Sequence, residues 1–246
     1  MICLVTDRRR LAAESGRPEG RPLRESRRPE GRPIRVAAPG TVRARLVAQI
    51  RDAVDAGVDL IQLREPDLEA GELASLVTEL LASTRGTPTR LVVNDRIDVA
   101  LACGADGVHL RANSIPVAAA RELSPAGFLI GRSVHSVAEA AAASDADYLI
   151  AGTVFPTPSK PALTHWLGID GLRSVVQAVD RPVLAIGGVT ADRIAEIASA
   201  GAAGFAAIGL FIPSHPDAER GRGRAAELRH SVESARSRFD RPNTTP

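Results

Sequence analysis

The chain has 246 residues, of which 44% are hydrophobic and 24% are charged, and its formal net charge is +2. This is enough apolar material for one barrel-sized core, with little left for a second domain. Two cysteines make no disulfide framework, and no stretch approaches the length of a membrane span. The composition therefore excludes a disulfide-stabilised secreted protein and a membrane-spanning one. We expect a cytoplasmic protein with no membrane partner.

Eight short apolar runs rich in β-forming residues recur along the chain. Segments with apolar residues spaced three and four apart separate them, for example Val42–Ala56 and Leu68–Leu81. This alternation predicts parallel strands joined by helices, and eight such units predict a single (β/α)8 TIM barrel. The predicted strands are Ile2–Thr6, Leu60–Arg64, Leu91–Asn94, Gly107–Leu110, Phe128–Ser133, Tyr148–Ala151, Val183–Ile186 and Gly204–Ile208.

The segment Arg8–Pro39 interrupts this pattern with ten arginines, many prolines and glycines, and a near-repeat, RPEGRPLR then RPEGRPIR. Because it cannot bury a core, we interpret residues 8–39 as a disordered, low-complexity insertion in the first βα-loop. Such an arm could attract an anionic partner, but no aromatic residues lie between the arginines to stack on bases, so we expect no nucleic acid partner. The barrel domain is placed at 1–238, and 239–246 is predicted to be a disordered tail.

Polar side chains follow the predicted second and third strands. Gln62 and Arg64 are two residues apart, so both can face the barrel axis, where an arginine suits phosphate or carboxylate. Arg64 could instead pair internally with Glu65. Asn94 could hold a phosphate oxygen and Asp95 could hold Mg²⁺, although Asp95 could also cap the helix that follows.

His135 follows the fifth strand in the sequence GRSVHS, and Ser133 lies two residues before it. Ser136 to Glu139 has the S-x-x-E pattern of a capping box, so a helix begins directly after the histidine. A histidine held at a strand end can remove and return a proton. His135 is therefore the candidate general acid/base, unless it only bonds neighbouring backbone.

The long loop Gly152–Gly168 carries the single lysine of the chain, Lys160. We interpret it as a lid whose Thr157, Ser159 and Lys160 close on a diphosphate, the alternative being an ordinary surface loop.

The last two predicted strands both end in glycine. The backbone is bare at Gly187, Gly188 and Gly209, so its N–H groups can approach an anion closely. These residues predict a phosphate site, the alternative being two tight turns without a ligand.

Six segments, QLRE, VNDRIDVAL, ADGVHL, GRSVHS, DYLIAGTVFPTPSK and AIGGVT, occur in an order and spacing that resemble the thiamine phosphate synthase and TenI-type thiazole tautomerase superfamily. The resemblance implies a (β/α)8 barrel of thiamine (vitamin B1) biosynthesis that acts on a thiazole phosphate. It covers nearly the whole chain except the arginine-rich insertion and the tail.

The synthase of this superfamily joins hydroxymethylpyrimidine diphosphate to thiazole phosphate and uses Mg²⁺ held by two aspartates. The resemblance assigns substrate binding to Gln62, Arg64, Asn94, Ser133, Thr157, Ser159 and Lys160 and one metal ligand to Asp95. Two positions depart from the synthase pattern, since Pro66 stands where a lysine is expected and Ser114 stands where the second aspartate is expected. Both departures remove a group that the synthase uses to bind the diphosphate.

The tautomerase moves a proton on a carboxythiazole phosphate and needs no metal cofactor. His135 matches its acid/base, and Gly188, Ile208 and Gly209 would hold the phosphate in either enzyme. We therefore expect a thiazole tautomerase, with the Mg²⁺-dependent synthase as one alternative and a non-catalytic thiazole-phosphate-binding regulator as another. The sequence also permits a homo-oligomer.

Overall fold

A computed structural model describes residues 1–13, 41–157, 165–212 and 222–239. Within these ranges the chain forms a closed barrel of eight parallel strands in sequential order, β1 to β8, with β8 paired back to β1. The strands are β1 (Ile2–Val5), β2 (Leu60–Leu63), β3 (Arg90–Asn94), β4 (Gly107–Leu110), β5 (Leu129–Val134), β6 (Tyr148–Gly152), β7 (Val183–Ile186) and β8 (Gly204–Ala207).

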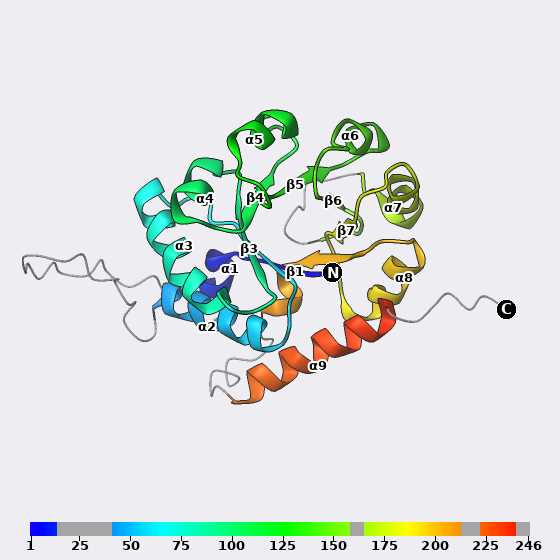
Figure 1. Ribbon diagram of the computed structural model, residues 1–246. Helices are drawn as coiled ribbons and strands as arrows, with labels where there is room; N and C mark the ends of the chain where they lie inside the picture. Colours follow the sequence, from blue (N-terminus) through cyan, green and yellow to red (C-terminus); the bar gives the residue numbers. More distant parts are fainter. Residues whose placement is uncertain (14–40, 158–164, 213–221, 240–246) are drawn as a thin grey trace, which may run out of the picture.

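Helices surround the barrel, as Figure 1 shows in a view along its axis. The α-helices are α1 (Arg8–Ala13), α2 (Val42–Asp55), α3 (Ala70–Thr84), α4 (Ile97–Cys103), α5 (Val117–Leu123), α6 (Val137–Ala142), α7 (Gly168–Gln177), α8 (Ile194–Ser199) and α9 (Arg222–Phe239). Two short 3₁₀ helices follow the last two strands, η1 (Ala191–Arg193) and η2 (Gly209–Phe211). The predicted fold class, a single (β/α)8 barrel, is confirmed.

The strands are buried on both faces, which explains their almost continuous apolar sequences. Cys3 and Val5 point into the barrel, while Ile2 and Leu4 pack toward the helices. The barrel interior is filled by Cys3, Val5, Leu60, Val92, Tyr148, Ile150, Leu184 and Ala206. Because the interior is filled with side chains, we expect ligands to bind at the C-terminal end of the barrel, where the βα-loops meet.

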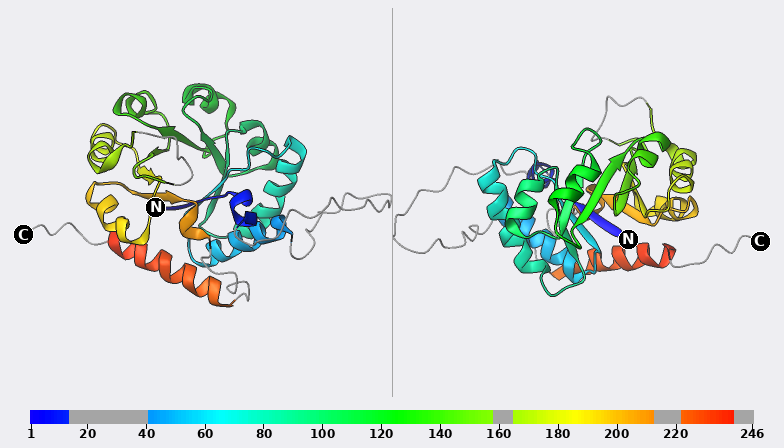
Figure 2. Two further views of the ribbon diagram at one scale, coloured as in Figure 1. Left: turned by 180° about the vertical axis from the view of Figure 1, so that it is seen from behind. Right: turned by 45° about the horizontal axis from the view of Figure 1, so that its top comes forward.

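The C-terminal helix α9 runs along the outside of the barrel between α2 and α8, as Figures 1 and 2 show. Its own Val232 and Ala235 are buried. Arg236 bonds Asp59 at 3.0 Å, at the start of β2. The helix thus covers the outer side of the first and last barrel units.

All eight predicted strands are present, with ends that shift by at most one residue. Two boundaries were wrong. The predicted disordered tail began at residue 239, but Phe239 is the last residue of α9 and stacks on Phe205. The predicted disordered insertion began at Arg8, but residues 8–13 form α1, because Leu11 and Ala12 are buried against the barrel. The rest of the predicted insertion and residues 240–246 of the predicted tail lie outside the described residues.

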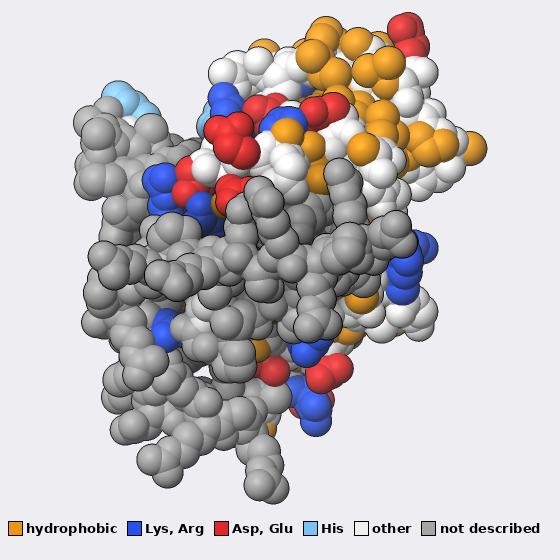
Figure 3. All heavy atoms as spheres, turned by 90° about the vertical axis from the view of Figure 1, so that its left-hand side faces the viewer, with side chains coloured by type: hydrophobic (Ala, Val, Ile, Leu, Met, Phe, Trp, Pro, Cys, Tyr) orange, Lys and Arg blue, Asp and Glu red, His pale blue; other side chains and the backbone are white. Residues whose placement is uncertain are grey.

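Acidic and basic side chains lie next to one another on the described part of the face in Figure 3, beside a group of hydrophobic side chains near its top. One ion pair between neighbouring outer helices joins Arg43 of α2 to Glu79 of α3 at 2.8 Å. Among the described helices, none is both long enough and apolar enough to cross a membrane.

Candidate active site

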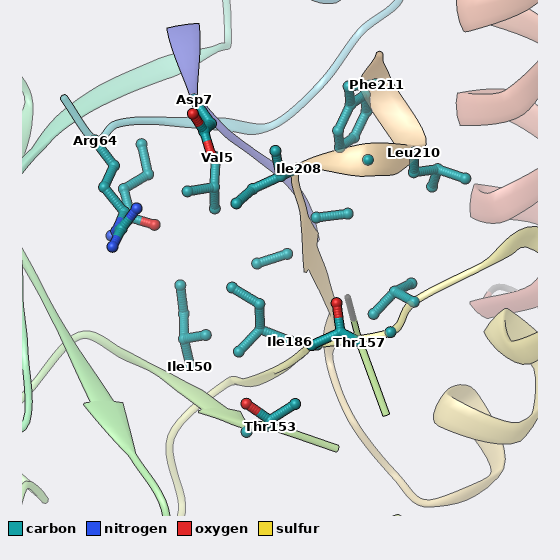
Figure 4. A pocket seen from close by; sticks show the side chains of 18 of the residues that line it. Val5, Asp7, Arg64, Ile150, Thr153, Thr157, Ile186, Ile208, Leu210 and Phe211 are labelled. Atoms are coloured by element: carbon teal, nitrogen blue, oxygen red, sulfur yellow. The ribbon is translucent and has the colours of Figure 1, made fainter. Parts of the chain in front are cut away.

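A cavity of about 1170 Å³ opens at the C-terminal ends of the strands. Val5, Ile150, Ile186 and Ile208 give it an apolar floor, and polar groups surround this floor. Figure 4 shows the guanidinium group of Arg64 pointing into the pocket, with Asp7 on the same side and Thr157 across from them. A concave apolar site with a few convergent polar groups is the usual form of a small-molecule site.

The cavity brings together most of the residues that the sequence predicted. The lining includes Gln62, Arg64, Asn94, Ser133, His135, Thr157, Gly187, Gly188, Ile208 and Gly209. Asp95 lies next to the lining residue Asn94 but is not itself part of the lining. Ser159 and Lys160, predicted to close over the ligand, lie outside the described residues.

Gln62 and Asn94 form a pair of side-chain amides at the ends of β2 and β3. The buried Gln62 donates from Nε2 to Oδ1 of Asn94 at 3.1 Å, which leaves the Asn94 amide nitrogen free to donate toward the cavity. The exposed Arg64 forms no ion pair with the described residues, so the predicted alternative, an internal pair with Glu65, is wrong. Glu65 pairs instead with Arg8.

Asp95 lies just outside the cavity with a positive φ of 63°. The hydroxyl of Ser114 donates to one of its carboxylate oxygens, and Nη1 of Arg111 lies 3.6 Å from the other. Helix α4 begins after Arg96 without a side-chain cap, so the alternative role of Asp95 as a helix cap is wrong. Among the described residues, no three His, Cys, Asp or Glu side chains gather to hold a metal ion.

His109 lies behind Ser133 and is buried. Its Nε2 is 2.9 Å from the Ser133 hydroxyl, and its Nδ1 is 3.2 Å from the Tyr148 hydroxyl. Burial, with a smaller effect from the Arg132 charge, lowers the pKa of His109 to about 3. A neutral imidazole has one donor and one acceptor nitrogen, so the two hydroxyls satisfy both and Ser133 is held in place.

His135 lies at the rim of the cavity, with 48% of its side chain exposed. One half of the predicted capping box is present, because the Ser136 hydroxyl accepts from the backbone N–H of Glu139, but the Glu139 carboxylate bonds His135 and not the backbone N–H of Ser136. The Glu139 carboxylate accepts from the backbone N–H of His135 at 2.8 Å and lies 3.1 Å from its Nδ1. The ring is thereby oriented, with Nε2 left for a ligand.

The β7 loop brings bare backbone to the cavity. Gly187 and Gly188 have φ of 98° and 64°, a region that favours glycine, and a methyl group on Gly188 would lie 2.5 Å from the carbonyl oxygen of Pro156. Nη1 of Arg193 bonds the carbonyl oxygen of Gly188 at 3.0 Å, and its guanidinium lies 4.4 Å from the centre of the Phe155 ring. This arginine joins the β6 loop to the β7 loop.

The sequence interpretation missed several lining residues, among them Asp7, Arg10, Arg111, Thr153 and Arg193. Arg10 was hidden inside a run of arginines that was assigned to the insertion. Arg193 follows the predicted glycine pair closely and could have been found from that spacing. Arg111 follows the fourth strand directly, and strand ends are where such barrels carry their active sites.

A closed parallel barrel with a cavity at the C-terminal ends of its strands, lined by polar side chains and by glycines of the last two loops, defines a (β/α)8 protein with a candidate small-molecule site. Residues 34–211 match the family described as thiamine monophosphate synthase. The chain belongs to this family, an enzyme family of thiamine biosynthesis.

Individual relatives agree with this assignment. A protein of Methanoregula boonei named thiamine-phosphate synthase is 42% identical over 191 residues, covering 77% of this chain and 87% of its own. A protein of the same name from Methanoculleus marisnigri is 44% identical over 164 residues, covering 66% and 78%. The solved thiamine phosphate pyrophosphorylase of Pyrococcus furiosus superposes with a TM-score of 0.68 at 33% identity, covering 95% of this chain and 96% of that one.

Proposed function

We propose that the protein is a thiamine phosphate synthase, a transferase that joins hydroxymethylpyrimidine diphosphate to thiazole phosphate. The observation that carries the proposal is that one cavity has two separate places for anions. Arg64 and Asn94 face it from β2 and β3, and the glycine ends of β7 and β8 face it from the other side of β1. A tautomerase has one phosphorylated substrate, whereas a synthase has two.

In the reaction, the ring nitrogen of the thiazole forms a bond to the exocyclic methylene carbon of the pyrimidine. The bond from that carbon to the diphosphate oxygen breaks, and its electron pair leaves with pyrophosphate. Arg64 binds the diphosphate and stabilises the charge that develops on it, since preorganised donors act most strongly where charge appears. Ser133, oriented by His109, and the Gln62–Asn94 pair orient the pyrimidine substrate.

The thiazole phosphate lies at the other end, on the backbone of Gly188, Ile208 and Gly209. Thr157 adds a hydroxyl beside it, and in the proposal Ser159 and Lys160 complete the same loop. This arrangement holds both substrates in one cavity, so the reacting atoms are close together and correctly oriented before the bond forms.

Asp95 would hold Mg²⁺ together with diphosphate oxygens and water, because Mg²⁺ at phosphate sites often takes only one or two carboxylates. One carboxylate with a neighbouring hydroxyl, Ser114, fits an ion carried mainly by the substrate. When bound, the ion would neutralise charge on the leaving pyrophosphate. The nearby Arg111 supplies positive charge from the protein itself.

The test is turnover of the purified protein with both substrates and Mg²⁺, followed by chromatography of thiamine phosphate and an assay of pyrophosphate. We expect both products in equal amounts, and at least tenfold less turnover in Arg64→Ala. Arg173→Ala is the matched control, because Arg173 lies on the outer helix α7, paired with Asp170. Intact substrates after long incubation with folded protein would contradict the proposal.

The tautomerase remains a second candidate because of the His135–Glu139 contact. A histidine with Nδ1 bonded to a carboxylate and Nε2 at a cavity rim is suited to moving a proton. His135→Ala separates the two functions. A synthase is expected to keep most of its turnover, whereas a tautomerase would lose isomerisation of carboxythiazole phosphate while still binding it.

A further inference from the structure

We propose that Arg10 of α1 is a phosphate-binding residue of this site, and that its guanidinium binds the monophosphate of the thiazole substrate beside Gly209. The inference rests on the proposed function for the identity of the substrate. It does not rest on catalysis, because binding of a phosphorylated ligand can be measured without turnover. Nothing in the sequence pattern of the site residues pointed to this arginine.

The contact between Arg10 and Gly209 carries the proposal. A methyl group built on Gly209 would lie 3.1 Å from Nη2 of Arg10, 3.3 Å from Nη1 and 3.4 Å from Cζ. The flat guanidinium therefore covers the bare backbone at the first residue of η2. Both Arg10 and Gly209 line the cavity. Gly209 has no positive φ, so its missing side chain serves this close approach rather than an unusual backbone conformation.

Helix α1 fixes where Arg10 lies. The Asp7 carboxylate accepts from the backbone N–H of Arg10 at 3.1 Å, and the Asp7 carbonyl accepts from Leu11 at 3.0 Å. Leu11 and Ala12 are buried against the barrel, 6% and 9% exposed. The half-buried Arg10 is therefore directed from a packed turn of helix.

Acidic residues of the β2 loop hold α1 from its other side. Both carboxylate oxygens of the buried Glu65 accept from the backbone N–H of Arg8 at 3.2 Å, and Nε of Arg8 lies 3.6 Å from one of them. Arg8 and Arg9 also pair with Asp67. These contacts tie the first turn of α1, which carries Arg10, to the loop that follows β2.

The other arginines of the cavity have different positions. Arg193 bonds the Gly188 carbonyl and stacks on Phe155, and Arg64 comes from β2. Arg10 therefore brings a cation to the end of β8, next to the proposed phosphate site on Gly188, Ile208 and Gly209. An arginine fork matches two oxygens of a phosphate dianion, and such charge-assisted bonds are about twice as strong as neutral ones.

It follows that Arg10 selects the phosphorylated thiazole over the free thiazole alcohol. Substitution of Arg10 should leave binding of the pyrimidine diphosphate unchanged, because its diphosphate is placed at Arg64. This split between the two substrates distinguishes a phosphate-binding residue from one that merely supports the fold.

The test compares the full-length wild type with Arg10→Ala, Arg10→Lys and the control Arg90→Ala. Arg90 begins β3 at the opposite end of the barrel and pairs with Asp106. In Arg10→Ala we expect a KM for thiazole phosphate at least tenfold higher, a KM for the pyrimidine diphosphate within twofold of wild type, and an unchanged melting temperature. Arg10→Lys keeps the charge but loses the fork, so an intermediate KM is expected.

Calorimetric binding of thiazole phosphate and of thiazole alcohol separates this proposal from the proposed function. If the wild type shows no turnover but binds the phosphate, the synthase proposal fails while Arg10 is still tested by the loss of phosphate binding in Arg10→Ala. Equal affinity of wild type and Arg10→Ala for thiazole phosphate overturns the inference. Equal losses for both substrates together with a lower melting temperature overturn it too, since they indicate a structural role.

Discussion

The Nε2 atom of His109 lies 2.9 Å from the hydroxyl oxygen of Ser133, and the same ring reaches the hydroxyl of Tyr148 through Nδ1. Neighbouring strands β4, β5 and β6 are linked by these contacts across the inside of the barrel. Gly131 makes room for them, because a methyl group there would lie 2.1 Å from the Tyr148 ring and 2.6 Å from His109. A buried, neutral histidine thus orients a hydroxyl that lines the cavity.

The first prediction concerns this positioning role. His109→Gln removes the ring that holds the Ser133 hydroxyl, and we expect kcat/KM for the pyrimidine substrate to fall by about tenfold, a loss of about 1.4 kcal/mol. His230→Gln, on the exposed side of α9, is the matched control. Steady-state kinetics with each substrate varied in turn would check the prediction. A normal kcat/KM in His109→Gln would show that Ser133 needs no such support.

The second prediction concerns stability below neutral pH. The pKa of His109 is lowered by burial from 6.5 to about 3, so the unfolded chain binds a proton between these values and the folded chain does not. The contribution of neutral His109 to the unfolding free energy is therefore complete above about pH 6.5 and is lost as the pH falls toward 3. Relative to His109→Gln, the wild type should lose unfolding free energy as the pH falls from 7 to 5, by roughly 2 kcal/mol.

Urea unfolding of both proteins at pH 7 and pH 5 measures this difference. The pH-dependent contributions of the other histidines to the unfolding free energy cancel in the comparison, because both proteins contain them. If the difference in unfolding free energy is the same at the two pH values, then His109 takes up a proton in the folded protein and is not buried as described.

The fold could be predicted from the sequence because each strand is a short apolar run and strands of a parallel barrel are buried on both faces. The site residues could be predicted because they follow those strands, and all strand ends of a parallel barrel meet at one edge. Gln62, His135 and Gly188 were found in this way. The expectation of a tautomerase depended on Pro66, Ser114 and His135, and the relatives named thiamine-phosphate synthase favour the alternative.

Other features depend on contacts between distant segments. Arg10 belongs to a run of arginines, and only the burial of Leu11 distinguishes α1 from the low-complexity sequence that follows. The bond between Ser114 and Asp95 joins residues 19 positions apart, and no local pattern predicts it. Hydrophobic periodicity also says nothing about which polar side chains face each other across a cavity.

The third prediction concerns the bare backbone at Gly188. Alanine there would have a positive φ and a methyl group 2.5 Å from the Pro156 carbonyl oxygen, so the β6 and β7 loops must move apart. We expect a loss of about 1–3 kcal/mol in unfolding free energy and weaker binding of thiazole phosphate. Gly71→Ala is the control, because nothing lies within 4 Å of a methyl group at that position in α3 and alanine favours helix. Wild-type behaviour of Gly188→Ala would show that this backbone does not contact the ligand.

The fourth prediction concerns Asp95 and Ser114. Ser114→Asp adds a second carboxylate beside Asp95, and because Mg²⁺ affinity rises with ligand charge, we expect the Mg²⁺ concentration for half-maximal turnover to fall about fivefold or more. Asp95→Asn should raise that concentration, and Ser114→Ala should change it little. The measurement is a Mg²⁺ titration of pyrophosphate release at saturating substrates. If the Mg²⁺ requirement stays the same in both Ser114→Asp and Asp95→Asn, Asp95 takes no part in holding the ion, and Arg64 and Arg111 supply the positive charge that the diphosphate needs.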